Sequence, residues 1–398
     1  MSASEVASSH LVSAVRLITF SCAATIALLG GGRAMAAPAA AAEATGLRAG
    51  PGGTVERAGR PYRGIGVNYF DCFLRTLKDG TDTSYAAGFA ALAARGIPFA
   101  RFCATGFWPK DLDLYRRDRA EYFRRLDGVV QAAERHGVGL VPSLFWHFPG
   151  VPDLVGEPMD QWGEPRSRTH AWMREYVAEV VGRYRASPAI WAWELGNEFN
   201  LAIDLPGGAT HRPKMVPALG TPATRSERDE LRLEHLEVAA AEFGRAVRAL
   251  DPVRLISAGH SFPRPSAWHL HAQRSWKKDD ENQLTEMLAR QNPAPIELLS
   301  VHVYRDDSLG RMDWLVGAAR RLGRPLFIGE FGVSAEKLSP EEQRREFAAL
   351  LAKVRQSGAP LAALWVYDYS RQTEWNVTAT NARAWQLEAV AAANRAEK

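Results

Sequence analysis

The chain has 398 residues, of which 46% are hydrophobic and 24% are charged, an ordinary composition for a globular protein with a large core. The net charge is only +4, and the basic residues are spread along the chain without a Lys/Arg block. Nucleic-acid surfaces usually carry clustered basic residues, so this distribution argues against a nucleic-acid partner.

The first 36 residues differ from the rest of the chain. Arg16 precedes an apolar run over 17–29, and an A-x-A pattern typical of signal-peptide cleavage follows at 34–36. Because the run is short for a membrane-spanning helix, we predict a signal peptide over 1–36 and a secreted or periplasmic protein without stable membrane insertion. An uncleaved membrane anchor is the alternative. A flexible mature N-terminus is expected over 37–51.

From residue 52 the sequence predicts a small hairpin over 52–63, followed by alternating strands and helices in a single domain over 52–398. The predicted strands are short apolar runs at 64–69, 98–103, 138–146, 190–198, 254–258, 297–304, 325–329 and 362–367. The predicted helices lie at 85–95, 114–136, 168–185, 226–250, 311–322, 340–357 and 381–393. This alternation predicts a parallel α/β fold, specifically a (β/α)8 TIM barrel. A doubly wound open sheet is the alternative, but the Gly-rich phosphate loop that usually follows its first strand is absent from the sequence.

Two segments interrupt the regular alternation. The segment 202–224 is a long loop with many Pro and Gly residues, and 268–291 is predicted as an irregular insertion with some helix. Loops of this length are usually functional. We expect 202–224 and 264–283 to be able to block one end of a cleft.

Cys72 and Cys103 remain beyond the predicted signal peptide. An even pair in an exported protein is compatible with a disulfide. Two separate buried thiols agree with the sequence equally well.

Ionisable, polar and aromatic side chains lie at the predicted carboxyl ends of the strands. In a parallel barrel these ends meet on one face, where barrel enzymes keep their catalytic groups. The candidate site residues, in chain order, are Asn68, Arg101, Trp146, His147, Asn197, Glu198, His260, His302, Tyr304, Glu330 and Trp365.

Glu198 and Glu330 predict a paired-carboxylate site. Glycoside hydrolysis needs one protonated carboxyl group for the leaving oxygen and one ionised carboxylate at the anomeric carbon. The charge on one carboxylate raises the pKa of the other. We expect Arg101 to keep its carboxylate partner ionised and Tyr304 to orient it. We expect Asn197 to hydrogen-bond a sugar hydroxyl.

The remaining candidates have less specific roles. Trp146 and Trp365 offer flat indole rings that can stack on sugar rings. His260 is equally compatible with a substrate contact and with a loop histidine that only supports the fold. Glu194 lies inside its strand, so we expect it to pair within the barrel.

Several of these residues together resemble the cellulase family, glycoside hydrolase family five of clan A. They are Arg101, Asn197-Glu198, His302-x-Tyr304, Glu330 and Trp365. The resemblance covers roughly 52–393. The run 193–198, preceded by Arg183-Tyr184 and by 187–190, is particularly similar to endo-β-mannanases of that family. The resemblance implies that Glu198 is the acid/base and Glu330 the nucleophile, with retention of configuration and with no metal or organic cofactor. Phe199 stands where the family usually has Pro, which leaves the substrate open.

These features together predict a secreted, monomeric, retaining glycoside hydrolase acting on a β-1,4-linked polysaccharide or oligosaccharide, with mannan or glucomannan favoured. A β-1,4-glucanase or an exo-β-glycosidase of the same fold is the alternative within the enzyme class. A non-catalytic carbohydrate-binding barrel is the alternative from a different class. Such a relative should have lost a carboxylate, Arg101 or His302, and the sequence retains all of them.

Overall fold

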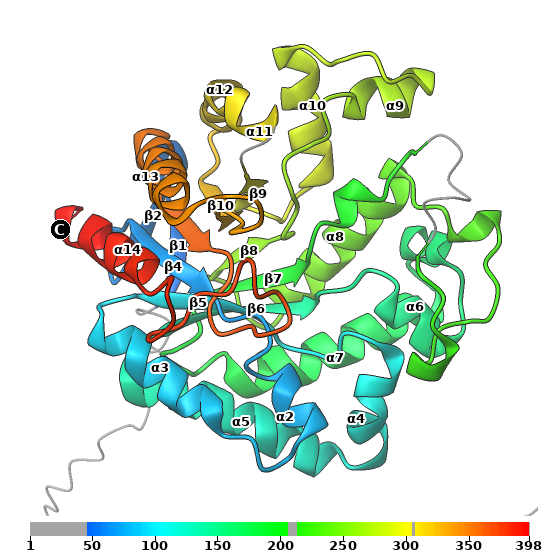
Figure 1. Cartoon of the computed structure of the whole chain (residues 1–398). Coiled ribbons are helices and arrows are strands. Elements are labelled where there is room, and N and C mark those ends of the chain that lie inside the picture. Colours follow the sequence, from blue (N-terminus) through cyan, green and yellow to red (C-terminus); the bar gives the residue numbers. More distant parts are fainter. Residues whose placement is uncertain (1–45, 206–212, 305–306, 398) are drawn as a thin grey trace, which may run out of the picture. The chain divides into compact units, whose positions relative to one another are not determined.

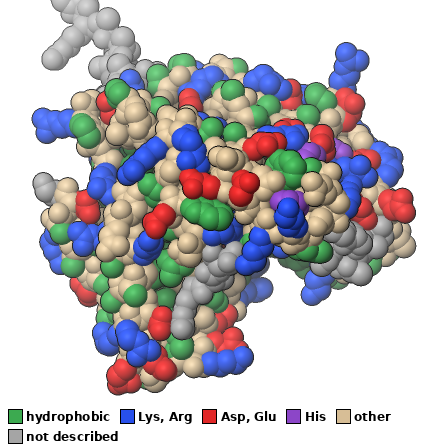
Figure 2. Space-filling view, turned by 90° about the horizontal axis from the view of Figure 1, so that it is seen from above, with side chains coloured by type: hydrophobic (Ala, Val, Ile, Leu, Met, Phe, Trp, Pro, Cys, Tyr) green, Lys and Arg blue, Asp and Glu red, His purple; other side chains and the backbone are tan. Residues whose placement is uncertain are grey.

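The computed structural model describes residues 46–205, 213–304 and 307–397. The predicted signal peptide and most of the expected flexible terminus lie outside the described residues. Within these ranges no helix has both the length and the apolar character needed to cross a membrane. Figure 2 shows one face of the molecule, on which basic and acidic side chains are interspersed, in agreement with the even spread of charge along the sequence.

Within the described ranges, eight parallel strands form one curved sheet, in the order β8-β7-β6-β5-β4-β11-β10-β9. The strands are β4 (Gly64–Asn68), β5 (Phe99–Cys103), β6 (Gly139–Phe145), β7 (Ala192–Gly196), β8 (Leu255–Ser257), β9 (Leu299–Val303), β10 (Leu326–Phe331) and β11 (Leu361–Leu364). A bridge between Ser257 and Leu298 joins the two ends of the sheet, so the barrel is nearly closed. The predicted (β/α)8 fold is therefore confirmed.

Helices surround the barrel and bury the outer face of the strands (Figure 1). They are α2 (Leu74–Lys78), α3 (Ser84–Ala94), α4 (Asp113–Arg117), α5 (Arg119–His136), α6 (Gly150–Val155), α7 (Arg168–Tyr184), α8 (Leu233–Arg248), α9 (Ala267–Gln273), α10 (Glu281–Gln291), α11 (Asp307–Gly310), α12 (Met312–Leu322), α13 (Pro340–Gln356) and α14 (Trp385–Ala396). Short 3-10 turns lie at Pro51–Gly53, Pro109–Leu112, Met159–Gly163, Phe199–Leu201, Pro217–Leu219 and Glu227–Asp229.

Two predicted helices are shorter than the sequence pattern suggested. The single helix expected over 114–136 is divided at Asp118, whose side chain caps α5 by accepting a hydrogen bond from the Glu121 N–H at 3.0 Å. Asp competes in this way for backbone N–H groups, which favours a helix start over a helix interior. The helix expected from 226 begins only at Leu233, after the 3-10 turn at Glu227–Asp229.

A small antiparallel sheet covers the amino-terminal end of the barrel. It contains β1 (Leu47–Gly50), β2 (Thr54–Arg57) and β3 (Arg60–Pro61), so the predicted hairpin is extended by one strand. The expectation of a flexible terminus over 37–51 is wrong for residues 47–50, which form β1. Leu47 is 1% exposed, and its N–H donates to the Trp191 carbonyl at 2.8 Å. This contact orders the chain.

Cys72 and Cys103 are buried thiols that form no disulfide with each other. Of the two arrangements that the sequence left open, the structure has the separate thiols. Burial raises the pKa of both groups, which disfavours the reactive thiolate at neutral pH.

Candidate active site

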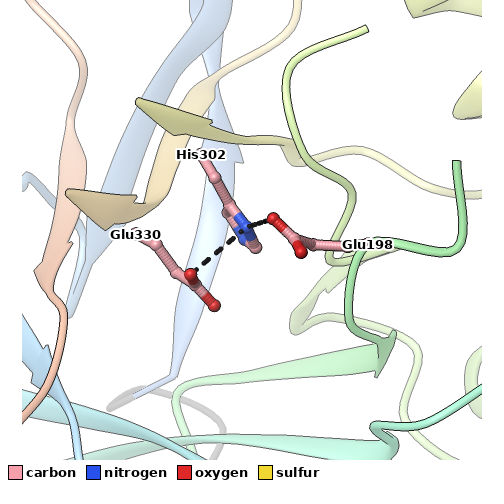
Figure 3. Close-up of side chains that lie close together, drawn as sticks. All are labelled: Glu198, His302 and Glu330. Carbon is pink, nitrogen blue, oxygen red and sulfur yellow. Dashed lines mark hydrogen bonds and ion pairs between the residues drawn. The ribbon is translucent and has the colours of Figure 1, made fainter. Parts of the chain in front are cut away.

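The side chains of Glu198, His302 and Glu330 point toward one another at the carboxyl end of the barrel (Figure 3). Glu198 follows β7, whereas His302 lies on β9 and Glu330 on β10. The backbone turns sharply after β7, where Glu198 has a φ of +56°, an uncommon value for a residue with a side chain. The Glu198 N–H donates to the Gly259 carbonyl at 3.0 Å, which holds this turn in place.

The two carboxyl groups are close neighbours. A hydrogen bond of 2.8 Å joins His302 Nδ1 to Glu198 Oε1, and the same nitrogen lies 3.5 Å from Glu330 Oε2. One oxygen of each carboxyl group and the histidine nitrogen all lie within 4.8 Å of one another. The imidazole therefore lies between the two acids.

Arg101, on β5, is fully buried beneath this pair and connects four other side chains. Its Nη1 donates to Glu330 Oε1 at 3.0 Å and to Asn68 Oδ1 at 3.0 Å. Its Nη2 donates to Asn197 Oδ1 at 2.8 Å. Its Nε donates to Glu194 Oε1 at 2.6 Å, which confirms that Glu194 pairs inside the barrel. The planar guanidinium group thus holds several polar residues in a fixed arrangement.

The two carboxyl groups have different electrostatic surroundings. Burial raises the pKa of Glu330, and the Glu198 charge adds to this; His302, Arg101 and the Tyr304 hydroxyl, which donates to Glu330 Oε2 at 2.6 Å, only partly oppose it. Burial also raises the pKa of Glu198, but the hydrogen bond and charge of His302, together with Ser261 and Arg101, outweigh it, so the net shift is downward. Glu198 is therefore the more acidic of the two, whereas the roles expected from the sequence need a protonated Glu198 and an ionised Glu330.

Aromatic rings form one wall of the site. Trp146 and Trp365 are stacked, with ring centroids 6.1 Å apart and an interplanar angle of 29°. The Arg101 guanidinium lies 4.3 Å from the centre of the Trp146 ring, which adds a cation–π contact. The Trp365 indole N–H donates to Gln372 Oε1 at 2.8 Å, so the loop after β11 fixes this ring.

Two adjoining cavities open around Glu198, and we name each by one of its residues. The Glu330 lobe is lined by Glu330, Tyr304 and a group of aromatic residues that includes Trp365 and Trp375. The Arg264 lobe is lined by Arg264, Lys214, His147 and residues from the loop after β7. Both lobes are lined by Phe107, Trp146, Asn197 and Glu198. The cavity is therefore a cleft with Glu198 at its middle.

Four predicted substrate contacts do not line this cleft, and one of them, His302, lies between the two acids with its side chain 0% exposed. Asn68 and Arg101 are 0% exposed, because their side chains fill the barrel interior below the cavity, so they position Glu330 and Asn197. His260 is 1% exposed, and burial lowers its pKa to about 3, so it is neutral. The strand-end rule identifies the barrel end at which a residue lies, but it does not indicate how deep the side chain lies.

Several cleft residues were not among the sequence-based candidates. Phe70, Tyr369 and Gln372 line the Glu330 lobe, and Arg264 and Lys214 line the Arg264 lobe. These residues come from loops, whose sequences lack the periodic pattern of apolar residues that identifies a strand. The only available signal was the position of these loops after the strands.

The set Glu198, His302 and Glu330 also offers oxygen and nitrogen atoms that could in principle hold a metal ion. However, Arg101 and Tyr304 already donate to the two oxygens of Glu330. A metal cation there would be repelled by the guanidinium charge. The arrangement is better suited to proton transfer and nucleophilic attack by carboxylates.

A (β/α)8 barrel with two facing carboxyl groups in an aromatic cleft is the arrangement of a glycoside hydrolase. Comparison with protein families agrees with this conclusion: the model described as Cellulase (glycosyl hydrolase family 5) matches residues 57–370. The chain therefore belongs to glycosyl hydrolase family 5, and it is an enzyme that hydrolyses O-glycosyl bonds.

The curated and solved relatives point the same way. The chain is 25% identical over 329 residues to mannan endo-1,4-beta-mannosidase 8 of Oryza sativa subsp. japonica, covering 70% of this chain and 77% of the relative. It is 40% identical over 85 residues to a probable mannan endo-1,4-beta-mannosidase F of Neosartorya fischeri, which is 20% of this chain and only 18% of that protein. An endo-1,4-beta-mannanase structure from Rhizomucor miehei superposes with a TM-score of 0.63 at 16% identity, covering 89% of this chain and 100% of that one. This structural likeness supports the fold.

Proposed function

We propose that this chain is a retaining glycoside hydrolase that cleaves β-1,4-linked mannan or glucomannan, with Glu198 as acid/base and Glu330 as nucleophile. The separation of the two carboxyl groups carries this proposal, since oxygens of Glu198 and Glu330 lie within 4.8 Å. Retaining enzymes hold the two groups about 5–5.5 Å apart, whereas inverting enzymes need about 6.5–9.5 Å to admit a water molecule. The short separation favours direct attack by Glu330.

The proposed reaction has two steps. In the first, a Glu330 oxygen attacks the anomeric carbon while Glu198 gives its proton to the leaving oxygen, which forms a covalent glycosyl-enzyme and releases the leaving saccharide. In the second, Glu198 takes a proton from water, and the hydroxyl oxygen displaces Glu330 from the sugar. Arg101 and Tyr304 stabilise the Glu330 carboxylate as it leaves.

Glu198 must carry a proton when the first step begins, although its surroundings in the structure lower its pKa. Its side chain is 32% exposed, and a bound glycan would cover this surface. Further burial disfavours the carboxylate and raises its pKa. Glycan binding therefore promotes proton uptake at Glu198.

The substrate is proposed from the relatives. The rice and Neosartorya proteins are named as mannan endo-1,4-beta-mannosidases, and the Rhizomucor structure as an endo-1,4-beta-mannanase. Because the matching family carries the name Cellulase, β-1,4-glucan is the second candidate. Export of the chain, with removal of residues 1–36, would bring the enzyme to such polymers.

The test is sugar release by the purified chain from separate mannan, glucomannan, β-glucan, cellulose and xylan samples. We expect release from mannan or glucomannan, with the β-anomer of the product appearing first by proton NMR. The Glu330→Gln variant should lose roughly 10⁴-fold or more in kcat, because it lacks the nucleophile. An α-anomer as first product would contradict retention. Binding of mannan without release, in the wild-type chain, would support the non-catalytic barrel instead.

A further inference from the structure

The two lobes of the cleft differ in charge. The Arg264 lobe is lined by two cationic side chains, Arg264 and Lys214. The described lining of the Glu330 lobe includes neither Lys nor Arg. A neutral mannan chain has no charged group that would use this difference.

The position of the two acids indicates which part of the glycan each lobe receives. Glu330 lines only its own lobe, so the sugar that it attacks lies there. Glu198 lines both lobes and gives its proton to the oxygen between the two sugars. The Arg264 lobe therefore receives the leaving part of the substrate. This assignment rests on the proposed function.

The charges of the Arg264 lobe are not balanced within its described lining. Glu198 is the one carboxyl group among those residues, and the first step requires it to be protonated. Arg264 donates to the Leu201 carbonyl, and the carboxylate whose charge acts on it is Glu198. Lys214 is exposed. At the moment of reaction two cations thus face a neutral acid.

We propose that the Arg264 lobe selects glycans whose leaving part carries a carboxylate, such as an acidic sugar. A carboxylate there would accept charge-assisted hydrogen bonds from Arg264 and Lys214, which are stronger than the bonds a neutral hydroxyl makes. Partial burial of Arg264 strengthens such a bond, because the surrounding dielectric is lower than in water. The Glu330 lobe, with its aromatic wall, takes neutral sugar rings.

The experiment uses one short β-1,4-manno-oligosaccharide in two forms, reduced to the alditol or oxidised at the same end to the aldonate. Both ends are open chains, so the two substrates differ mainly in one carboxylate. At low salt we expect the wild-type enzyme to prefer the aldonate in kcat/KM by about tenfold, the effect of one hydrogen bond to a charged group. Added salt should reduce the preference, because Lys214 is exposed to solvent.

Variants locate the effect. Lys214→Gln and Arg264→Met should each reduce the ratio of the two kcat/KM values toward one. Arg60→Gln removes the same charge from an exposed residue of β3, at the other end of the barrel, and should leave the ratio unchanged. If Arg264→Met fails to fold, the exposed Lys214 variant still decides the outcome.

Calorimetric binding of both sugars to Glu330→Gln separates this inference from the proposed function. Cleavage and binding of both forms with equal efficiency would overturn the inference and leave the proposed function standing. Tighter aldonate binding without cleavage of either form by the wild type would overturn the proposed function alone. A preference that survives both substitutions would also overturn the role of these two residues.

Discussion

Two buried arginines at opposite ends of the barrel show how the same residue type serves different purposes. Arg254 precedes β8 at the amino-terminal end, is 1% exposed, and pairs with Asp251 at 2.8 Å. Its Nε also donates to the Ile190 carbonyl at 2.9 Å. Arg101 lies near the carboxyl end and shares its charge between Glu194 and Glu330. Only the second arginine touches a carboxylate that borders the cleft.

The difference lies in the partners, because both side chains are equally buried. A buried ion pair adds little net stability. Removing one partner, however, leaves the other charge buried without a counter-charge, which strongly lowers the free energy of unfolding. Asp251 is held by its arginine and by the Trp193 indole N–H at 2.9 Å, away from the cleft. The Arg254 pair therefore supports the fold, whereas the Arg101 cluster supports the fold and also lowers the pKa of Glu330.

Of the substitutions that test this comparison, Arg101→Met should have the largest effect on activity. The charge of Arg101 lowers the pKa of Glu330, so its loss raises that pKa, and Glu330 then ionises only at higher pH. We expect kcat to fall roughly 10²–10³-fold. The acid limb of the pH profile of kcat, which reports the glycan-bound enzyme with its raised Glu198 pKa, should move to higher pH. Rates measured across the pH range, well below the melting temperature, check this. An acid limb that stays in place would contradict the assigned role.

Arg254→Met is the matched variant at the other end. Because Asp251 would be left buried without its cation, we expect the free energy of unfolding to fall by about 3–5 kcal/mol. The pH–rate profile should keep its shape, since Asp251 and the Ile190 carbonyl, which are partners of Arg254, lie away from the cleft. Denaturant unfolding and the same rate measurements test both points. A displaced acid limb in this variant would remove the distinction between the two arginines.

His302→Gln should have the smallest effect on kcat and should act on both acids, because His302 lowers the pKa of Glu330 as well as that of Glu198. His302 lowers the pKa of Glu198, so without it Glu198 keeps its proton to higher pH. The alkaline limb should therefore move to higher pH, and kcat should fall roughly tenfold with the loss of one hydrogen bond to a charged group. Comparison of the alkaline limbs of variant and wild type is the measurement. A shift to lower pH would mean that His302 does not stabilise the Glu198 carboxylate.

Predictions from sequence were most accurate where local chemistry decides the outcome. Apolar runs alternating with amphipathic helices predicted the barrel, and polar residues after those runs predicted the barrel face that carries Glu198 and Glu330. Glu194, inside its strand, was correctly expected to pair within the barrel. Errors occurred where a single side chain changes the backbone, as at Asp118, and at Leu47, where a distant carbonyl orders the chain.

The sequence by itself determined the fold, the order of the strand ends and the presence of two acids, because each depends on short-range periodicity and on the parallel arrangement of strands. Only the tertiary structure decided how deeply each side chain is buried and which residues it contacts. It placed Asn68, Arg101 and His260 below the cleft, and it brought Arg264 and Lys214 from separate loops to one side of Glu198. Burial and proximity between distant segments set the pKa of each acid and the charge of each lobe, and they arise only when the barrel closes.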